Sequence, residues 1–217
     1  DVTGFTLTRS TVQRNSNTVD GSEANLRFLD LWGTCAIQSS TISDSPYDNI
    51  RLTPSSGTLN QLTIANSTLG PTPTGGNHGL LIIGSGTADV TVSVDTTTFT
   101  GNYGSGLLTA FSGSSAQHIT VQNSTFTGNA TGVDLGHAST ADWNFAGSGN
   151  TFVNQQTNAI FVTAADLAST GRGTLTGNTI GNGTAESGAA EQYGIQVSQR
   201  GAAHLIVGIT NNTIRNT

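Results

Sequence analysis

The sequence predicts an all-β protein: a right-handed, single-stranded parallel β-helix of about eight coils, with three short strands in each coil. One unit recurs eight times, at a mean step of about 29 residues. The 217 residues include 28 Gly, 36 Thr and 19 Asn, which favour strands and turns over helices. The predicted hand follows from the general preference for right-handed crossovers between parallel strands.

The recurring unit reads apolar-x-apolar, two residues, a small polar residue, Thr and a final apolar residue. The second and the final apolar residues are five positions apart in seven of the eight units, as in Leu7 to Val12. The exception is the unit assigned to Trp143-Asn144-Phe145, in which Phe152 follows Phe145 by seven positions. The Thr residues of the units are Thr11, Thr41, Thr68, Thr98, Thr125, Thr151, Thr179 and Thr213.

A second apolar segment lies between successive units, in most cases after a Gly or an Ala. Each period therefore offers three short extended segments joined by turn-forming residues. Coils stacked at the ~4.8 Å strand spacing bring like residues together, so we expect a column of Thr residues and internal apolar ladders. The apolar segments begin at Leu26, Ile50, Leu80, Leu107, Val133, Ile160 and Ile195.

Asparagine recurs in the turn after the unit. Asn102 and Asn129 follow the final apolar residue by three positions, and Asn154 and Asn182 follow it by two. Asn tolerates left-handed backbone angles and bonds neighbouring amides, so we expect these side chains to reach the next coil.

A β-sandwich is the alternative architecture for this composition, but sandwich strands do not repeat one register eight times. Residues 1–217 are therefore predicted to form a single β-helix domain. The repeat runs from Phe5 to Asn216 without a polar or helical cap, and the chain has no Met. We accordingly expect a segment of a longer solenoid.

Several of these repeats resemble those of a known superfold. The run Asn-Ser-Thr-Phe-Thr-Gly-Asn at 123–129, with Gly-Asn-Thr-Phe at 149–152 and Gly-Asn-Thr-Ile at 177–180, is similar to parallel β-helix repeats of the pectate-lyase-like superfold. The resemblance is closest to repeats of bacterial surface and secreted proteins, including autotransporter-like passengers. It implies the fold but not the activity, because this superfold hosts lyases, hydrolases, phage tailspikes and adhesins.

The composition excludes several partners. Seven cationic residues, all Arg, stand against 13 acidic residues, so no basic surface is available and we expect no nucleic-acid partner. No apolar run approaches the ~20 residues of a membrane helix, so we expect no membrane-spanning segment. The single cysteine, Cys35, cannot form an intrachain disulfide and is expected to be buried.

Asp134 and His137 are the candidate catalytic residues, because an acid followed closely by Gly136-His137 resembles part of a polygalacturonase site, and His78-Gly79 invites the same comparison. Glycoside hydrolysis needs paired carboxylates, but the coil register places Leu108 and Phe161 beside Asp134. No Asn-Thr-Asp sequence or Asp-Asp pair completes the polygalacturonase pattern. We therefore predict no catalytic site beyond these two candidates, no cofactor and no metal site.

The Thr column raises a further alternative, an ice-binding surface, which requires two matched columns. The second column would consist of the residues two positions after each Thr, and it is interrupted, for example by Gln13, Gly70 and Val153. Structural laddering therefore explains the Thr residues better. Aromatic residues near loops are better candidates for contact with a sugar or a partner, namely Trp32, Tyr47, Tyr103 and Tyr193.

The function predicted from these features is that of a non-catalytic, extracellular structural or adhesive module, such as a stalk, adhesin or filament segment. The alternative is a polysaccharide lyase, a glycoside hydrolase or a carbohydrate-binding β-helix domain. The expected location is secreted or at the cell surface. The expected partners are a polysaccharide, another protein, or further copies of the chain joined end to end or laterally.

Overall fold

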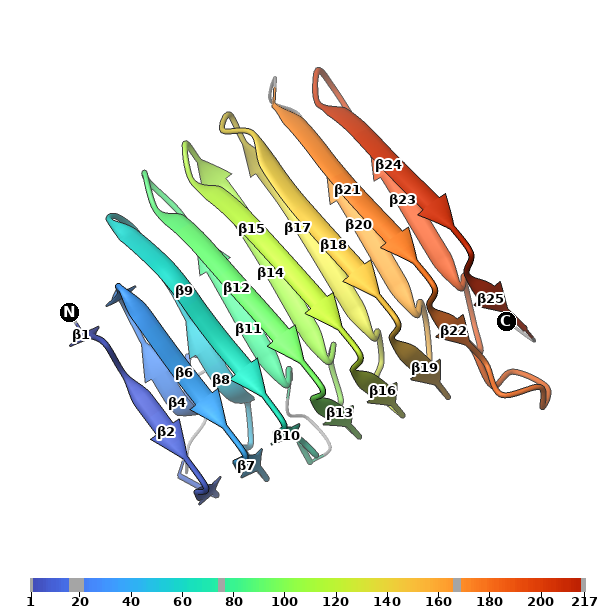
Figure 1. Cartoon of the computed structure of the whole chain (residues 1–217), viewed down its shortest axis with the longest axis horizontal. Helices are drawn as coiled ribbons and strands as arrows, with labels where there is room; N and C mark the ends of the chain where they lie inside the picture. The colour runs from blue at the N-terminus through green and yellow to red at the C-terminus, as the bar shows by residue number, and fades with distance from the viewer. Residues whose placement is uncertain (1, 16–21, 74–76, 166–168, 216–217) are drawn as a thin grey trace.

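The computed structural model describes residues 2–15, 22–73, 77–165 and 169–215. Within these ranges all regular structure is β-strand, and the strands wind right-handedly around one axis (Figure 1). They form three parallel sheets, which we call the front, edge and back sheets by their place in Figure 1. A separate pair, β1 (Val2–Thr3) with β5 (Leu31–Trp32), lies at the N-terminal end.

The front and edge sheets each contain eight strands. The front sheet consists of β2 (Thr6–Thr8), β6 (Thr34–Gln38), β9 (Thr58–Ala65), β12 (Asp89–Asp95), β15 (Ala116–Gln122), β18 (Trp143–Ser148), β21 (Thr170–Thr176) and β24 (His204–Thr210). The edge sheet consists of β3 (Thr11–Gln13), β7 (Thr41–Ser43), β10 (Thr68–Leu69), β13 (Thr98–Thr100), β16 (Thr125–Thr127), β19 (Thr151–Val153), β22 (Thr179–Ile180) and β25 (Thr213–Ile214).

The back sheet contains seven strands, so the coil count is slightly below the prediction. Its strands are β4 (Ala24–Phe28), β8 (Asp48–Leu52), β11 (Leu80–Gly84), β14 (Leu107–Gly113), β17 (Val133–Ser139), β20 (Ile160–Ala164) and β23 (Ile195–Gln199). Seven complete coils of back, front and edge strand are preceded by a first coil that contributes only β2 and β3. The expected eight three-stranded coils are therefore seven, because no back-sheet strand precedes β2 in the described residues.

The predicted register is confirmed along the whole stack. The unit's Thr residues pair from Thr11 to Thr213 through every strand of the edge sheet. The back sheet pairs Leu26 through Leu80 to Ile195 in the same way. Like residues therefore stack on like residues, as the period requires.

The core fills the space between the three sheets. Inward side chains alternate with outward ones, so that Val90, Val92 and Val94 of β12 are fully buried. On the edge sheet, the rings of Phe99 and Phe126 stack with centroids 4.6 Å apart, and those of Phe126 and Phe152 with centroids 4.8 Å apart. Apolar ladders bury side chains along the stack, and this aromatic ladder spans three coils.

The corner between the front and edge sheets requires a left-handed residue in each coil. The residues there have φ between 48° and 64°, a region that favours Gly and Asn. Their repetition accounts for part of the high Gly and Asn content. The column contains Arg9, Ser39, Asn66, Thr96, Asn123, Gly149, Gly177 and Asn211.

The small polar residue of the unit follows this corner and joins successive coils. Its side-chain oxygen accepts the backbone N–H of its counterpart in the preceding coil, as in Ser124 to Asn150 at 2.9 Å and Asn178 to Asn212 at 2.9 Å. Because these groups are largely buried, the bonds satisfy donors that the turn would otherwise leave unpaired.

A second buried ladder of amides runs along the turn before the back sheet. Asn102 donates to Asn129, as the turn positions predict, and Asn49, which the turn positions do not single out, donates to Asn102. The next member is Gln155, which accepts from Asn129 at 3.2 Å. Asn154 and Asn182 do not join this ladder: Asn154 adopts the expected left-handed backbone angle just after β19, with φ 57°, and Asn182 lies exposed in a loop.

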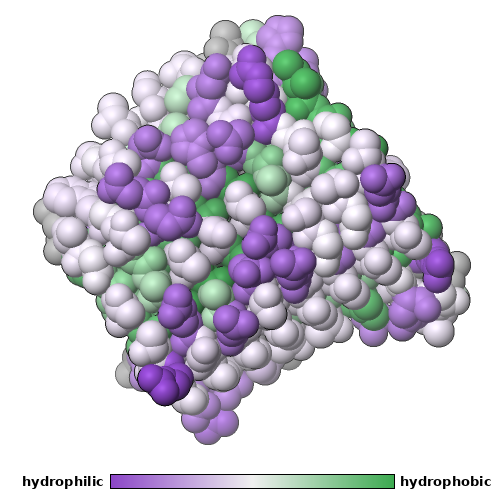
Figure 2. All heavy atoms as spheres, in the orientation of Figure 1, coloured by the Kyte–Doolittle hydropathy of each residue, from purple (hydrophilic) through white to green (hydrophobic). Residues whose placement is uncertain are grey.

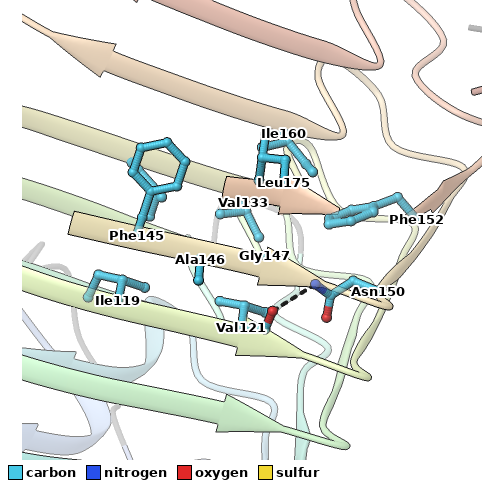
Figure 3. Close-up of a pocket in the computed structure, with 11 residues that line it drawn as sticks. Ile119, Val121, Val133, Phe145, Ala146, Gly147, Asn150, Phe152, Ile160 and Leu175 are labelled. Atoms are coloured by element: carbon cyan, nitrogen blue, oxygen red, sulfur yellow. Dashed lines mark hydrogen bonds between the residues drawn. The ribbon is translucent and has the colours of Figure 1, made fainter. Parts of the chain in front are cut away.

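The register of one unit also differs from the prediction. Phe145 pairs with Ile119 and Gly147 pairs with Val121, so Gly147 rather than Phe145 fills the second apolar position. Leu175 of the next coil reaches into the space above Gly147 (Figure 3). A cavity of about 20 Å³ remains beside these residues. The five-residue spacing therefore holds in all eight units, and Trp143 is a buried residue that precedes its unit.

Candidate functional site

The outward face of the back sheet carries a shallow groove of about 300 Å³. Strand alternation points every second residue of β11, β14, β17 and β20 away from the core toward this face. We call the hollow the outer groove. It is lined by Ile83, Ala110, Phe111, Ser112, Gly136, His137, Ala138, Thr163 and Ala165.

Gly136 leaves the centre of the outer groove bare. It pairs with Ala110 of the preceding coil and with Thr163 of the following coil. A Cβ atom at Gly136 would lie 2.9 Å from the backbone oxygen of Thr109, so a side chain there would press against fixed backbone. Two adjacent coils therefore present only a hydrogen and a methyl group, which creates the hollow.

Asp134 lies on the same face of β17, two residues before Gly136. Its neighbours in the sheet are Leu108 and Phe161, as the coil register predicts. No hydrogen bond or ion pair joins its carboxylate to another described residue, and burial raises its pKa to about 6. Asp134 is not among the residues that line the outer groove; its carboxylate lies beside the groove on the same face, flanked by two apolar side chains and uncompensated among the described residues.

Although His137 is among the residues that line the outer groove, its buried ring lies on the opposite face of the same strand. Its ring is buried and stacks on Trp143 at a centroid distance of 4.8 Å. Its Nε2 lies 2.9 Å from the Ala141 carbonyl oxygen, and its Nδ1 lies 3.3 Å from Nε2 of Gln117. Burial is the main cause that lowers its pKa. The sheet therefore separates Asp134 from His137, and the two do not form an acid–base pair.

Sequence reasoning missed a polar cluster at the start of the back sheet. Asp48 is fully buried, accepts a bond from Arg51 at 3.0 Å and accepts the backbone N–H of His78 at 3.1 Å. Nδ1 of His78 in turn accepts the backbone N–H of Ser105 at 2.9 Å. Burial lowers the pKa of His78 to about 4, so its imidazole is neutral at pH 7. The cluster fastens the segment before β11 to the sheet, and its signal in the sequence is only the Asp48-x-x-Arg51 spacing.

The front sheet presents a flatter, mixed surface (Figure 2). His118 lies 3.3 Å from an Asp89 carboxylate oxygen, and its Nδ1 lies 2.7 Å from the side-chain nitrogen of Asn144. Asp142 and Arg172 approach to 3.7 Å with both side chains largely exposed. Exposed pairs of this kind contribute little to stability and form no hollow.

The aromatic candidates divide by exposure. Tyr103 and Tyr193 are 55% and 57% exposed, and remain available for contact with a partner. Trp32 and Tyr47 are half-buried. Trp32 packs over Gly57, where a Cβ atom would lie 2.8 Å from Nε1 of the indole. Trp32 therefore contributes to packing at the N-terminal end.

The described ranges show no metal cluster and no membrane-spanning helix. No group of three or more His, Cys, Asp and Glu side chains there gathers at metal-binding distance. Nor do these ranges contain a helix long and apolar enough to cross a membrane. The positions two residues after each edge-sheet Thr form a second column beside the Thr column. Gly70 and Val153 interrupt the run of polar residues in this second column, and Val153 pairs with Thr127 there.

Fold and surface together define a parallel β-helix repeat protein with a shallow groove over the back sheet. Comparison with known families, curated proteins and solved structures returned no match to this chain. The outer groove and Asp134 therefore carry the functional argument by their own geometry.

Proposed function

We propose that this chain is a non-catalytic, extracellular structural and adhesive β-helix module of the pectate-lyase-like type found in bacterial surface proteins. The observation that carries the proposal is the unbroken stacking of the coils. Apolar ladders and the pairing of strands in all three sheets run along the stack, and hydroxyl and amide side chains bond across several of the interfaces between coils. Such a stack is stiff, since bending it would break several ladders together.

A non-catalytic role is supported by the chemistry of the outer groove. In the described back-sheet strands the acids are Asp48 and Asp134, and Asp48 is occupied by Arg51 and the His78 amide. A single carboxylate without a second acid or a facing base does not supply general acid–base hydrolysis. Low charge and the complete absence of Lys support an extracellular, protease-exposed setting.

The first test is a turnover assay with acidic and neutral polysaccharides. We expect neither new reducing ends nor unsaturated products from the wild-type chain. Turnover that Asp134→Ala abolishes would overturn the non-catalytic assignment. Location is tested separately by antibody detection in surface, secreted and cytoplasmic fractions of source cells, where a purely cytoplasmic signal would contradict the proposal.

The outer groove also favours a second candidate function, binding of a polysaccharide without cleavage. Its apolar floor, the Thr163 hydroxyl and the Asp134 carboxylate could contact a sugar ring. A glycan array read with the wild-type chain and with Asp134→Asn tests this candidate. Binding of a neutral glycan that the variant loses would favour it, and an array without signal would exclude it for the glycans present.

A further inference from the structure

The outer groove pairs an apolar hollow with one carboxylate that lacks a counter-charge. Asp134 is flanked by Leu108 and Phe161 along the axis, and the hollow over Ala110 and Gly136 begins two residues further along the strands. A charge held against apolar groups loses hydration without gaining a partner. A cation with an apolar stem would pair with the carboxylate and would cover the apolar hollow.

The described part of the chain does not supply this cation. Its arginine ion pairs lie elsewhere: Arg14 with Asp44, Arg51 with Asp48, and Arg172 with Asp142. The residues beside Asp134 on β14 and β20 are apolar. A cation that pairs with Asp134 must therefore come from another molecule.

The dimensions of the site match a lysine side chain. Gly136 lies about 6.6 Å from Asp134 along the strand, at about 3.3 Å per residue. The flexible four-carbon stem of Lys spans a comparable length and can lie along apolar surface while its ammonium reaches an acid.

Arginine fits less well because its guanidinium carries five donors in a rigid fork. Besides the Asp134 carboxylate, the outward side chains that line the hollow offer acceptor oxygens only at Ser112 and Thr163. Burying an arginine there would leave donors unpaired, whereas a compact ammonium has fewer to satisfy.

We propose that the outer groove binds a lysine side chain of a partner protein, with the ammonium on Asp134 and the stem over Ala110 and Gly136. This inference rests on the proposed adhesive function and names the chemistry of its partner. A second copy of the chain is not the occupant, because the sequence contains no Lys.

The test is an NMR titration of the ¹⁵N-labelled full chain with the peptide acetyl-Gly-Gly-Lys-Gly-Gly-amide. We expect amide shifts centred on Ala110, Gly136 and Thr163. Matched peptides with norleucine, arginine or Nε-acetyl-lysine at the central position should bind at least tenfold more weakly. Equal binding of the norleucine peptide, or no shifts with the lysine peptide, would overturn the proposal.

Variants test separately how the Asp134 charge and the apolar hollow contribute to lysine-peptide binding. Asp134→Asn should weaken lysine-peptide binding at least tenfold, whereas the matched front-sheet variant Asp95→Asn should change it less than twofold. Ala110→Leu keeps the carboxylate, fills the hollow, and should weaken binding at least fivefold. Wild-type affinity in either groove variant would contradict the proposed geometry.

A stability measurement guards against a merely structural role for Asp134. The melting temperature of Asp134→Asn should equal or exceed that of the wild-type chain, because the carboxylate has no partner to lose. A lower melting temperature would overturn the inference. If the lysine peptide does not bind while immobilised chain still adheres to cells or glycans, the lysine site fails and the adhesive function stands.

Discussion

Thr96 holds the least favourable conformation in the corner column. Its φ is 49°, and it is the one β-branched residue among the described left-handed positions of that column. Its neighbours in the stack, Asn66 and Asn123, adopt the same angles with a side chain that tolerates them. A left-handed conformation costs an ordinary L-residue about 1–2 kcal/mol, so the Thr96 corner stores strain of this size.

We therefore expect Thr96→Asn to raise the free energy of unfolding by about 1 kcal/mol. The bond from the Thr96 hydroxyl to Asp95 is exposed and contributes little. The reverse exchange, Asn123→Thr, should lower the free energy by a similar amount. Urea unfolding of both variants provides the measurement, and a loss of stability in Thr96→Asn would contradict the strain.

Asp134 and His78 give opposite contributions to the pH dependence of stability. The pKa of Asp134 is raised to about 6 in the fold, so its contribution is present at low pH and is lost as pH rises through 6. The pKa of His78 is lowered to about 4, so its contribution is present above about pH 6.5 and is lost as pH falls. Because the two contributions change in opposite directions over the same pH range, the pH dependence of wild-type stability does not reveal either group.

Asp134→Asn should expose the first contribution. A rise of the pKa from 3.8 to about 6 corresponds to a cost of roughly 3 kcal/mol for the ionised carboxylate. The variant should therefore exceed the wild type in stability at pH 7.5, and the difference should shrink toward pH 4. Urea unfolding at three pH values measures it, with Asp95→Asn as the control. A difference that grows toward acid would show that the sign is wrong.

Two neighbouring strands of the front sheet each pack a large side chain against a glycine of the other strand. Phe145 of β18 covers Gly173 of β21, where a Cβ atom would overlap the phenyl ring. Leu175 of β21 covers Gly147 of β18, where a Cβ atom would lie 2.9 Å from a methyl group. The two strands are thus complementary, and the small cavity lies beside the looser contact (Figure 3).

Gly173→Ala should destabilise the fold by about 2 kcal/mol, because the ring above it is packed and cannot move aside. Phe145→Leu should relieve the clash, so the double variant should be more stable than the sum of the single effects predicts. Gly147→Ala serves as the control and should cost less than about 1 kcal/mol, since the end of Leu175 can shift. Additive effects in the double-mutant cycle would contradict this packing.

The whole stack exposes apolar surface on its last coil. Ile209 and Ile214 point inward in register with the core ladders, yet they are 48% and 47% exposed. Ile206 is 60% exposed and lies on the outward side of the same strand as Ile209, in register with Arg172. Hydrophobic surface also appears along this C-terminal side in Figure 2. A chain of these 217 residues thus presents a ready template for another coil.

We expect this chain to associate through that coil as its concentration rises. Sedimentation velocity should show an increasing average mass for the wild type, and Ile209→Arg should abolish the increase. Ile206→Arg adds the same charge to the outward side and should leave end-to-end association intact. If Ile206→Arg abolishes association and Ile209→Arg does not, contact is lateral. A strictly monomeric wild type would contradict both modes.

Much of this fold follows from short-range pattern. The five-residue spacing and the Thr positions predict which residues stack, because identical coils can bury their apolar residues only in one common register. The neighbours of Asp134 follow from the same register. That Asp134 and His137 point apart is also implied by their three-residue separation on one strand.

Other features arise only when distant segments meet. The bond from Asn49 to Asn102 joins residues 53 positions apart, and the Asp48, Arg51 and His78 cluster depends on how one turn closes over the next. Local pattern also could not decide whether Phe145 or Gly147 fills an apolar position, because the answer depends on Leu175 in the next coil. The outer groove also depends on contacts between coils. The sequence does not distinguish Gly136 from the other glycines among its 28, whereas in the fold Gly136 packs beside Thr109 and Ala110. Repetition along the chain thus specifies the coil, whereas contacts between coils specify where its surface is hollow and leave the Asp134 carboxylate without a partner among the described residues.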